Sequence, residues 1–266
     1  MDDTATNAAF GSSAATLPMI SQTNGDSATL YRPATLLWMA VLAGFSVPVL
    51  TLLDVPIARW FHGNPLPREV SEALELTRVF SHGSGVFVML LGILLLAPRR
   101  RWHVPRLAAL ALGGGAVATV AKMFVLRPRP SGLNLDLATY EAAWWWAFDW
   151  NLSRVATFDA GTRAFPSGNM AVATALTIGL WVTLPRGRWL FAMVCFGTLA
   201  QRLHGGSHFL SDAIGGAALG LLWAFVCYHP RLLGAFFDKL GPEPAAERRR
   251  SATAAADEPS QVSAAA

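Results

Sequence analysis

The sequence is poor in charged residues and in cysteine. Charged side chains make up 14% of the 266 residues and hydrophobic ones 53%, which excludes an ordinary soluble domain. The net charge is only +4, and the charged residues lie in short clusters between apolar runs. No continuous basic surface for nucleic acid is therefore expected. Cys195 and Cys227 lie within apolar runs, which excludes a disulfide-stapled fold and a cysteine metal site. The composition is that of an integral membrane protein.

Long apolar runs are also missing from both ends of the chain. Residues 1–32 are rich in Ala, Ser, Thr, Asn and Asp, and contain no apolar core of a cleavable signal peptide. Residues 241–266 are similarly polar and small. We therefore predict two disordered tails around one membrane domain over residues 33–240.

Between the tails, six apolar segments are candidates for helices that cross a bilayer, which takes about 20 residues. They are Ala34–Leu53, Gly85–Ala97, Leu107–Val125, Ser167–Leu184, Trp189–Leu203 and Asp212–Tyr228. These segments predict an all-α fold, a six-span transmembrane helix bundle. In the long loop 54–84, the partly amphipathic stretch Arg68–Phe80 suits a helix lying along the membrane interface.

The distribution of Lys and Arg over the loops gives an orientation, because cytoplasmic loops carry an excess of them. If both termini are cytoplasmic, the larger group of basic residues falls inside. It comprises Arg32, Arg99, Arg100, Arg101, Arg106, Arg186, Arg188, Arg231, Lys239 and Arg248–Arg250. The smaller group outside comprises Arg59, Arg68, Arg78, Arg127, Arg129, Arg154 and Arg163. We therefore predict a multi-pass protein of the cell (inner) membrane with both termini in the cytoplasm.

The second long outer loop, residues 126–166, is dense in large aromatic side chains. It contains Trp144, Trp145, Trp146, Phe148 and Trp150. Indole rings are common at the headgroup level, so an interfacial anchor is the favoured interpretation. A platform on which substrate stacks is the alternative, because the loop adjoins the proposed site.

Three clusters of ionisable or small polar residues close or open the predicted spans. They are Lys122–Pro130, Phe165–Asn169 and Arg202–Asp212. In the predicted topology all three fall at the outer face. Charged groups at such positions are costly unless they are paired or functional.

Each cluster suits the recognition of an oxyanion. Lys122, Arg129 and Arg202 supply three cationic donors for one phosphoryl group. Pro166-Ser167-Gly168 has the pattern of a helix start, where free amides attract an anion. His208 and Asp212 are four residues apart on one helical face, so the carboxylate can hold one ring nitrogen and leave the other for attack. Taken singly, the cations could be snorkelling anchors and the His–Asp pair a structural contact.

Together these residues resemble the PAP2 superfamily of type 2 phosphatidic acid phosphatases and vanadium haloperoxidases, in its integral-membrane lipid phosphatase branch. The family pattern is Lys, six residues, Arg-Pro; then Pro-Ser-Gly-His; then Ser-Arg, five residues, His, three residues, Asp. Lys122 with Arg129-Pro130 matches the first element and Pro166-Ser167-Gly168 matches three positions of the second. Arg202, His208 and Asp212 match the third.

The resemblance implies a role for each matched residue. Lys122, Arg129, Arg202, Ser167 and the Gly168 amide would bind the phosphoryl group; His208 would attack phosphorus, and Asp212 would orient His208. It implies a phosphohistidine intermediate and no cofactor or metal, and the sequence has no Asp/Glu/His cluster with metal-site spacing.

Two positions depart from the family pattern. Gln201 replaces the Ser before Arg202, and Asn169 replaces the His that protonates the leaving oxygen in the family. Three explanations of Asn169 are open: a leaving group that needs no proton, a substitute acid such as His204, or a site that binds without turnover.

The leading functional hypothesis is a membrane phosphatase acting on a lipid phosphate or pyrophosphate at the outer leaflet. Substrates of this class include isoprenyl pyrophosphate, phosphatidic acid, phosphatidylglycerol phosphate and lipid A phosphate. A lipid phosphotransferase and a non-catalytic binder or transporter of anionic lipid are the alternatives. The expected partners are the substrate and membrane lipids, and no nucleic acid.

Overall fold

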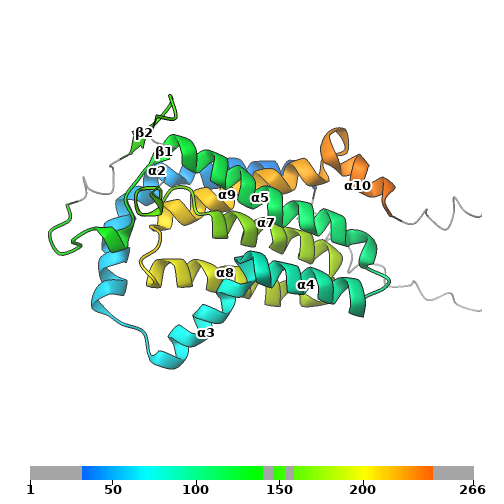
Figure 1. Ribbon diagram of the computed structural model, residues 1–266, viewed down its shortest axis with the longest axis horizontal. Coiled ribbons are helices and arrows are strands. Elements are labelled where there is room, and N and C mark those ends of the chain that lie inside the picture. Colours follow the sequence, from blue (N-terminus) through cyan, green and yellow to red (C-terminus); the bar gives the residue numbers. More distant parts are fainter. Residues whose placement is uncertain (1–31, 140–145, 154–158, 242–266) are drawn as a thin grey trace, which may run out of the picture.

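The computed structural model describes residues 32–139, 146–153 and 159–241, most of which are helical (Figure 1). The helices are α2 (Pro33–Gly63), α3 (Arg68–Arg78), α4 (Gly83–Leu96), α5 (Val104–Phe124), α7 (Gly168–Thr183), α8 (Arg188–His204), α9 (Leu210–Tyr228) and α10 (Ala235–Lys239). Two short strands, β1 (Val125–Leu126) and β2 (Ala147–Phe148), pair antiparallel. Nearly all of both predicted tails, with Trp144, Trp145 and Arg154, lies outside the described residues.

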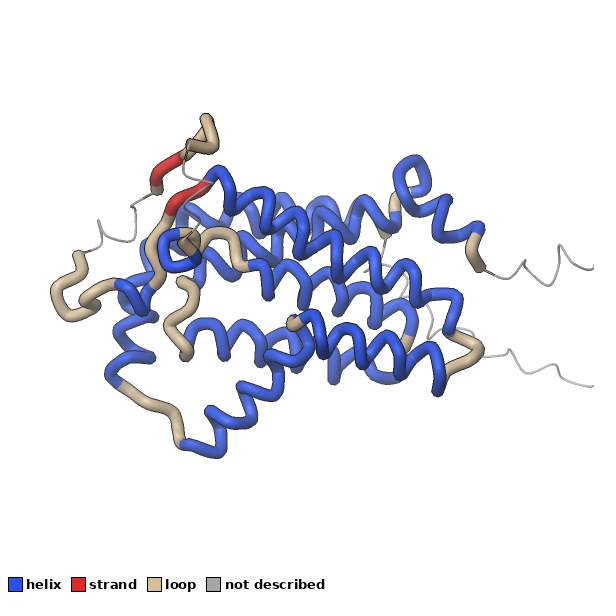
Figure 2. Tube along the Cα trace, in the orientation of Figure 1, coloured by secondary structure: helices blue, strands red, loops and turns tan. Residues whose placement is uncertain are grey.

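Each of the six segments predicted to span the membrane is helical, which confirms the all-α membrane fold (Figure 2). Within the described residues, three helices are long and apolar enough to cross a bilayer: α2, α9 and the stretch Arg101–Phe124 that contains α5. The bent pair Arg68–Ser81 and Gly83–Leu96 would add a fourth span if it is counted as one, and α7 is a shorter apolar helix. The count of six spans stays a prediction.

Helix α2 continues well beyond the predicted end of the first span. The prediction ended at Leu53 because Asp54 and Arg59 are charged, but the helix runs on through Pro56 to Gly63. Asp54 is only 1% exposed, so it does not mark a loop in water. A buried carboxylate needs partners, and those partners turn out to belong to the candidate site.

Helix α3 confirms the amphipathic helix predicted in the 54–84 loop. None of its residues is buried, and it meets α4 at a bend of 70° after the short 3₁₀ turn Val79–Ser81. In Figure 1 α3 projects from the bundle and α4 lies within it. Because α3 buries no apolar face of its own, its position depends on the contacts described below with α8.

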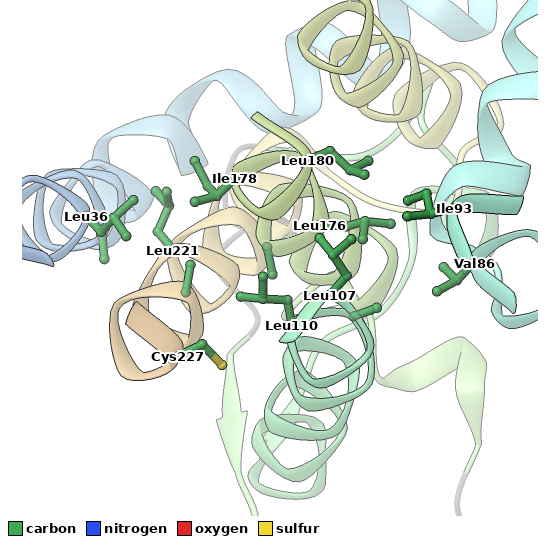
Figure 3. Packing of buried hydrophobic residues seen from close by; sticks show 14 residues of the cluster. Leu36, Val86, Ile93, Leu107, Leu110, Leu176, Ile178, Leu180, Leu221 and Cys227 are labelled. Carbon is green, nitrogen blue, oxygen red and sulfur yellow. The ribbon is translucent and has the colours of Figure 1, made fainter. Parts of the chain in front are cut away.

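The bundle is apolar both inside and outside. Leu107, Leu110, Leu176 and Leu180 are at most 1% exposed and form part of the buried cluster that joins the helices (Figure 3). Large apolar side chains also cover the outer surface, including Trp38, Phe45, Phe87, Leu112 and Phe196. A water-soluble protein rarely exposes so much contiguous apolar surface, whereas a membrane protein presents it to lipid.

Close packing of α9 on α7 depends on two glycines spaced four apart. A Cβ atom at Gly216 would lie 2.2 Å from the carbonyl oxygen of Ser167, and one at Gly220 would lie 2.5 Å from that of Ala171. Small residues at this spacing let two helix backbones approach each other in a membrane. The contact fixes the start of α7 beside the start of α9, which is where two of the three predicted clusters lie.

Candidate active site

Backbone hydrogen bonds join the three predicted clusters at one end of the bundle, on the left in Figure 1. The first and second clusters pair through Ala164 N–H and the Arg127 carbonyl at 2.9 Å. The second and third pair through Ser167 N–H and the Asp212 carbonyl, also at 2.9 Å. Ser131 N–H donates to the Gly206 carbonyl at 3.0 Å. Segments that are distant in the sequence are thus held together by main-chain atoms.

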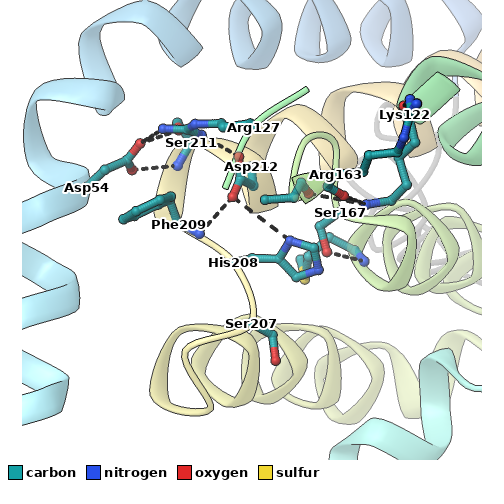
Figure 4. A network of polar contacts seen from close by, with 12 residues as sticks. Asp54, Lys122, Arg127, Arg163, Ser167, Ser207, His208, Phe209, Ser211 and Asp212 are labelled. Atoms are coloured by element: carbon teal, nitrogen blue, oxygen red, sulfur yellow. Dashed lines mark hydrogen bonds and ion pairs between the residues drawn. The ribbon is translucent and has the colours of Figure 1, made fainter. Parts of the chain in front are cut away.

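His208 and Asp212 face each other as predicted (Figure 4). Nδ1 of His208 lies 3.9 Å from Oδ2 of Asp212, within ion-pair distance but too far for a hydrogen bond. His208 is 5% exposed and Asp212 is fully buried. The Phe209 N–H also donates to Oδ2 of Asp212, at 2.8 Å, so the carboxylate is fixed at the start of α9. Nδ1 is thus the ring nitrogen of His208 that faces Asp212, and Nε2 is the nitrogen on the other side of the ring.

The three predicted cations, Lys122, Arg129 and Arg202, differ in how many of their hydrogen-bond donors already have partners. Nζ of Lys122 donates to the carbonyls of Arg163 at 2.8 Å and Ala164 at 3.2 Å, which leaves one of its three hydrogens for a ligand. Nε of Arg202 donates to Oε1 of Gln201 at 2.5 Å, which leaves its terminal nitrogens without partners among the described residues. Nε of Arg129 is buried and has no hydrogen-bond partner in that part of the chain. Donors without partners suit an anion that is yet to bind.

The electrostatics of His208 show that these cations converge on it. Burial is the largest effect, and it lowers the pKa of His208 well below its ordinary value. The positive charges of Lys122, Arg129 and Arg202 lower this pKa further. The backbone carbonyl of Ala164 raises it by a smaller amount. His208 is therefore neutral at physiological pH, which is the form that can act as a nucleophile.

The predicted helix start at Ser167 is confirmed. Ser167 is the N-cap of α7, and its hydroxyl accepts from the Met170 N–H at 3.5 Å. The amides of Gly168 and Asn169 make no hydrogen bonds within the described residues, so both are available to an anion. The Asn169 side chain is half-buried and likewise has no hydrogen-bond partner among those residues.

The PAP2 superfamily profile matches residues 102–232, which contain all three clusters. The chain belongs to the PAP2 superfamily. No curated protein sequence matches the chain at a significant level.

A solved structure shares the fold of this PAP2 member. It is the first transmembrane PAP2 type phosphatidylglycerolphosphate phosphatase from Bacillus subtilis, with a TM-score of 0.50 and 17% sequence identity. The match covers 80% of this chain and 98% of that one. At this identity the likeness concerns the fold, which is therefore that of a transmembrane PAP2 protein.

The sequence did not reveal a buried network beside His208 and Asp212. Arg127 donates from Nη1 to Asp212 Oδ1 and, at 2.7 Å, to the Ser211 hydroxyl. From Nη2 it donates to Asp54 Oδ2 at 2.6 Å. Asp54 also accepts from the Ser211 N–H at 2.9 Å and from its hydroxyl. Arg127 had been counted as a loop charge, yet it is 1% exposed and holds two carboxylates in place (Figure 4). The sequence held one sign of this role, because Arg127 directly follows the apolar segment that ends at Leu126.

Trp146 covers this network and does not fit either predicted role of the aromatic loop. The Arg127 guanidinium lies 4.5 Å from the centre of the Trp146 ring, a distance typical of a cation–π contact. Trp150 and Phe148 are 72% and 53% exposed and stack on each other, as an interfacial anchor would. Trp146 therefore contacts a buried cation, and the anchor role of Phe148 and Trp150 stays a prediction.

His204, the predicted substitute acid, is the last residue of α8 and contacts α3. Its Nε2 is 3.3 Å from the Ser71 hydroxyl on α3, and its Nδ1 is buried without a hydrogen-bond partner among the described residues. It lines a cavity of about 500 Å³ together with Phe61, Pro130, Ser131 and Asp136. Among the described residues, no group of three or more His, Cys, Asp or Glu side chains could hold a metal ion.

We expect Arg127→Ala to destabilise the protein strongly. The substitution leaves Asp54 and Asp212 buried without their shared cation, and breaking a buried pair in this way typically costs about 3–5 kcal/mol. Thermal unfolding in detergent measures the effect. Arg68→Ala is the control, because the Arg68–Glu72 pair is exposed and such pairs contribute little. Equal shifts in the two variants would contradict a structural role for Arg127.

Proposed function

We propose that this protein is a membrane phosphatase that hydrolyses a lipid phosphate or pyrophosphate through a phosphohistidine on His208. Membership in the PAP2 superfamily and the transmembrane fold support a membrane phosphatase in general terms. The observation that carries the specific proposal is the environment of His208. A neutral, buried imidazole lies beside Asp212 while three cations act on it from other elements.

In the proposed first step, Nε2 of His208 attacks phosphorus, and the bond from phosphorus to the leaving oxygen breaks as the new P–N bond forms. The leaving oxygen takes the bonding electron pair. Asp212 stabilises the positive charge that develops on the ring, and Lys122, Arg129 and Arg202 stabilise the equatorial oxygens. Water then attacks phosphorus, the P–N bond breaks, and inorganic phosphate leaves with His208 restored.

We propose that the site end of the bundle faces the periplasm or the cell exterior. The opposite end carries the dense basic loops, with Arg99, Arg100 and Arg101 between α4 and α5 and Arg186 between α7 and α8. Such clusters favour the cytoplasm. The substrate would then be a lipid whose phosphate lies in the outer leaflet.

The region beside the phosphate-binding residues can receive the remainder of a polar headgroup. The 500 Å³ cavity is lined by Pro130, which follows Arg129, and by Leu203, which follows Arg202. Polar groups from His62, His204 and Asp136 line it together with Phe61 and Leu133. We propose that the leaving part of the substrate enters here, with its acyl or prenyl chain in the membrane.

A panel of lipid mono- and pyrophosphates, with released phosphate as the readout, tests this proposal. Trapping a phosphoenzyme from a ³²P-labelled substrate, stable in base and labile in acid, tests the intermediate. Lipid or sugar acceptors with a free hydroxyl, added to the same assay, would reveal the phosphotransferase alternative. The absence of any turnover with saturable lipid binding would favour the binder, for which Asn169 is the supporting observation.

We expect Arg129→Lys and Arg202→Lys each to lower activity about tenfold to hundredfold, although charge is conserved. A lysine ammonium cannot reproduce the two-point contact of a guanidinium with a phosphoryl group, and one hydrogen bond to a charged group is worth a factor in this range. Phosphate release by the purified variants measures it. Arg99→Lys and Arg186→Lys, at exposed positions at the far end of the bundle, should be unaffected. Similar losses in all four would indicate a general folding defect.

A further inference from the structure

Helix α3 is held against α8 by polar contacts at successive turns. The Thr198 hydroxyl donates to the Thr77 carbonyl at 3.2 Å, and a Cβ atom at Gly197 would lie 2.6 Å from the Thr77 side chain. Nearly two turns further along, Nε2 of His204 lies 3.3 Å from the Ser71 hydroxyl. An exposed helix with no buried residue is thus fixed along the helix that carries Arg202.

Between these contacts, a chain of two short hydrogen bonds runs from α3 to Arg202. Nε2 of Gln201 donates to Oε1 of Glu75 at 2.6 Å. Oε1 of Gln201 accepts from Nε of Arg202 at 2.5 Å. Gln201 is 4% exposed and Arg202 is 7% exposed, so the bond between them competes little with water. The Glu75 side chain is 54% exposed, so its bond to Gln201 lies at the edge of the protein surface. The other carboxylate oxygen of Glu75 lies 3.9 Å from Arg78 and does not take part.

The chemistry of this chain determines which way the Gln201 amide points. A carboxylate only accepts hydrogen bonds and a guanidinium only donates them. Glu75 therefore selects the orientation in which the amide NH₂ faces α3 and the amide oxygen faces Arg202. Without Glu75 the amide could turn over and present NH₂ to the guanidinium, which would leave two donors facing each other.

We propose that Glu75 and Gln201 are positioning residues that aim Arg202 at the phosphoryl group. With Nε held by Gln201, the two terminal nitrogens of Arg202 make no hydrogen bond within the described residues and are left for the substrate. Serine, which the PAP2 pattern has before this arginine, is too short to bridge Arg202 and a carboxylate on α3. Gln201 thus ties the phosphate site to the amphipathic helix α3. The proposal rests on the proposed function in assigning Arg202 to phosphate binding.

The test compares Glu75→Ala, Glu75→Gln, Gln201→Ala and the double variant Glu75→Ala/Gln201→Ala. Glu75→Ala and Gln201→Ala should each weaken the binding of orthovanadate and inorganic phosphate about tenfold. The reason is that each removes a hydrogen bond to a charged group, and the free energy of such a bond corresponds to a factor of this size. Glu75→Gln should stay close to wild type, because its side-chain oxygen can still accept from Gln201. The double variant should lose no more than Gln201→Ala alone, because the two residues act in series.

Glu72→Ala is the matched control, since Glu72 lies one turn before Glu75 on α3 and pairs with the exposed Arg68. The unfolding temperatures of all variants should agree within a few degrees. If Glu75 and Gln201 only supported the fold, their substitution would not change the affinity for the anion. Additive losses in the double variant, or a Glu75→Ala variant that behaves like Glu72→Ala, would overturn the proposal. If wild type binds orthovanadate in a Glu75-dependent way but releases no phosphate from lipids, the positioning role stands and the proposed function fails.

Discussion

We expect His208→Ala to lose lipid phosphatase activity by about 10⁴-fold or more, because removing a nucleophile closes the covalent route. Binding should change little, since Lys122, Arg129, Arg202 and the amides of Gly168 and Asn169 remain. Turnover is measured as released phosphate, and binding as competition by orthovanadate. In wild type, burial and the three cations lower the pKa of His208, so activity should persist as pH falls below 6.5 before the ring protonates.

The control for this experiment is His82→Ala. His82 is exposed at the start of α4 and bonds to Ser84 at 3.0 Å, so its loss should leave turnover unchanged. A His208→Ala protein with near-normal activity would exclude a phosphohistidine mechanism. Failure of both variants would indicate that the assay reports folding and not chemistry.

The spacing of the motif residues allowed the site to be predicted because each spacing corresponds to a local geometry. The offset of four from His208 to Asp212 predicted that the two side chains face each other, and Pro166-Ser167-Gly168 predicted a helix start. The two do face each other, but His208 lies just before α9, which begins at Leu210, and so does not share a helical face with Asp212. The family pattern then gave the order of the clusters along the chain. Their meeting point follows from alternating helix directions, which place the end of α5 and the starts of α7 and α9 together.

What the sequence did not reveal depends on contacts between distant segments. The role of Asp54 required α2 to continue past a charge, and that charge is tolerated only because Arg127 reaches it from the loop after α5. The link from Glu75 to Arg202 required α3 to lie along α8. No spacing rule places one helix against another, so polar residues in such contacts look like ordinary surface charges in the sequence.

The second large effect is expected from Asn169→His. In the PAP2 pattern the histidine at this position protonates the leaving oxygen, and an amide cannot donate a proton in this way. A departing phosphate is a weak base and can leave unaided, whereas a departing alkoxide needs a proton. Wild type should therefore prefer lipid pyrophosphates over matched monophosphates. General acid catalysis is worth about 10²- to 10⁴-fold, so Asn169→His should raise the monophosphate rate by up to that factor.

Asn169 stands where a donated proton would be useful. It is the second residue of α7, next to the free Gly168 amide, and its side chain has no hydrogen-bond partner among the described residues. Asn151→His, at an exposed turn, is the control for adding a histidine. Asn169→Ala tests a simpler role, in which the Asn169 amide only contacts a phosphate oxygen. If that is its role, Asn169→Ala should lower the monophosphate and pyrophosphate rates by the same factor.

His204 is the competing source of the proton, and the same substrates distinguish it. Its buried Nδ1 lacks a hydrogen-bond partner and lies at the cavity proposed for the leaving group. If His204 donates, wild type should hydrolyse mono- and pyrophosphates at similar rates, Asn169→His should change neither, and His204→Ala should lower only the monophosphate rate. The opposite outcome has three parts: wild type prefers pyrophosphates, His204→Ala leaves both rates unchanged, and Asn169→His raises only the monophosphate rate. That outcome would show that this chain hydrolyses its substrate without the family's acid, because its natural leaving group needs no proton.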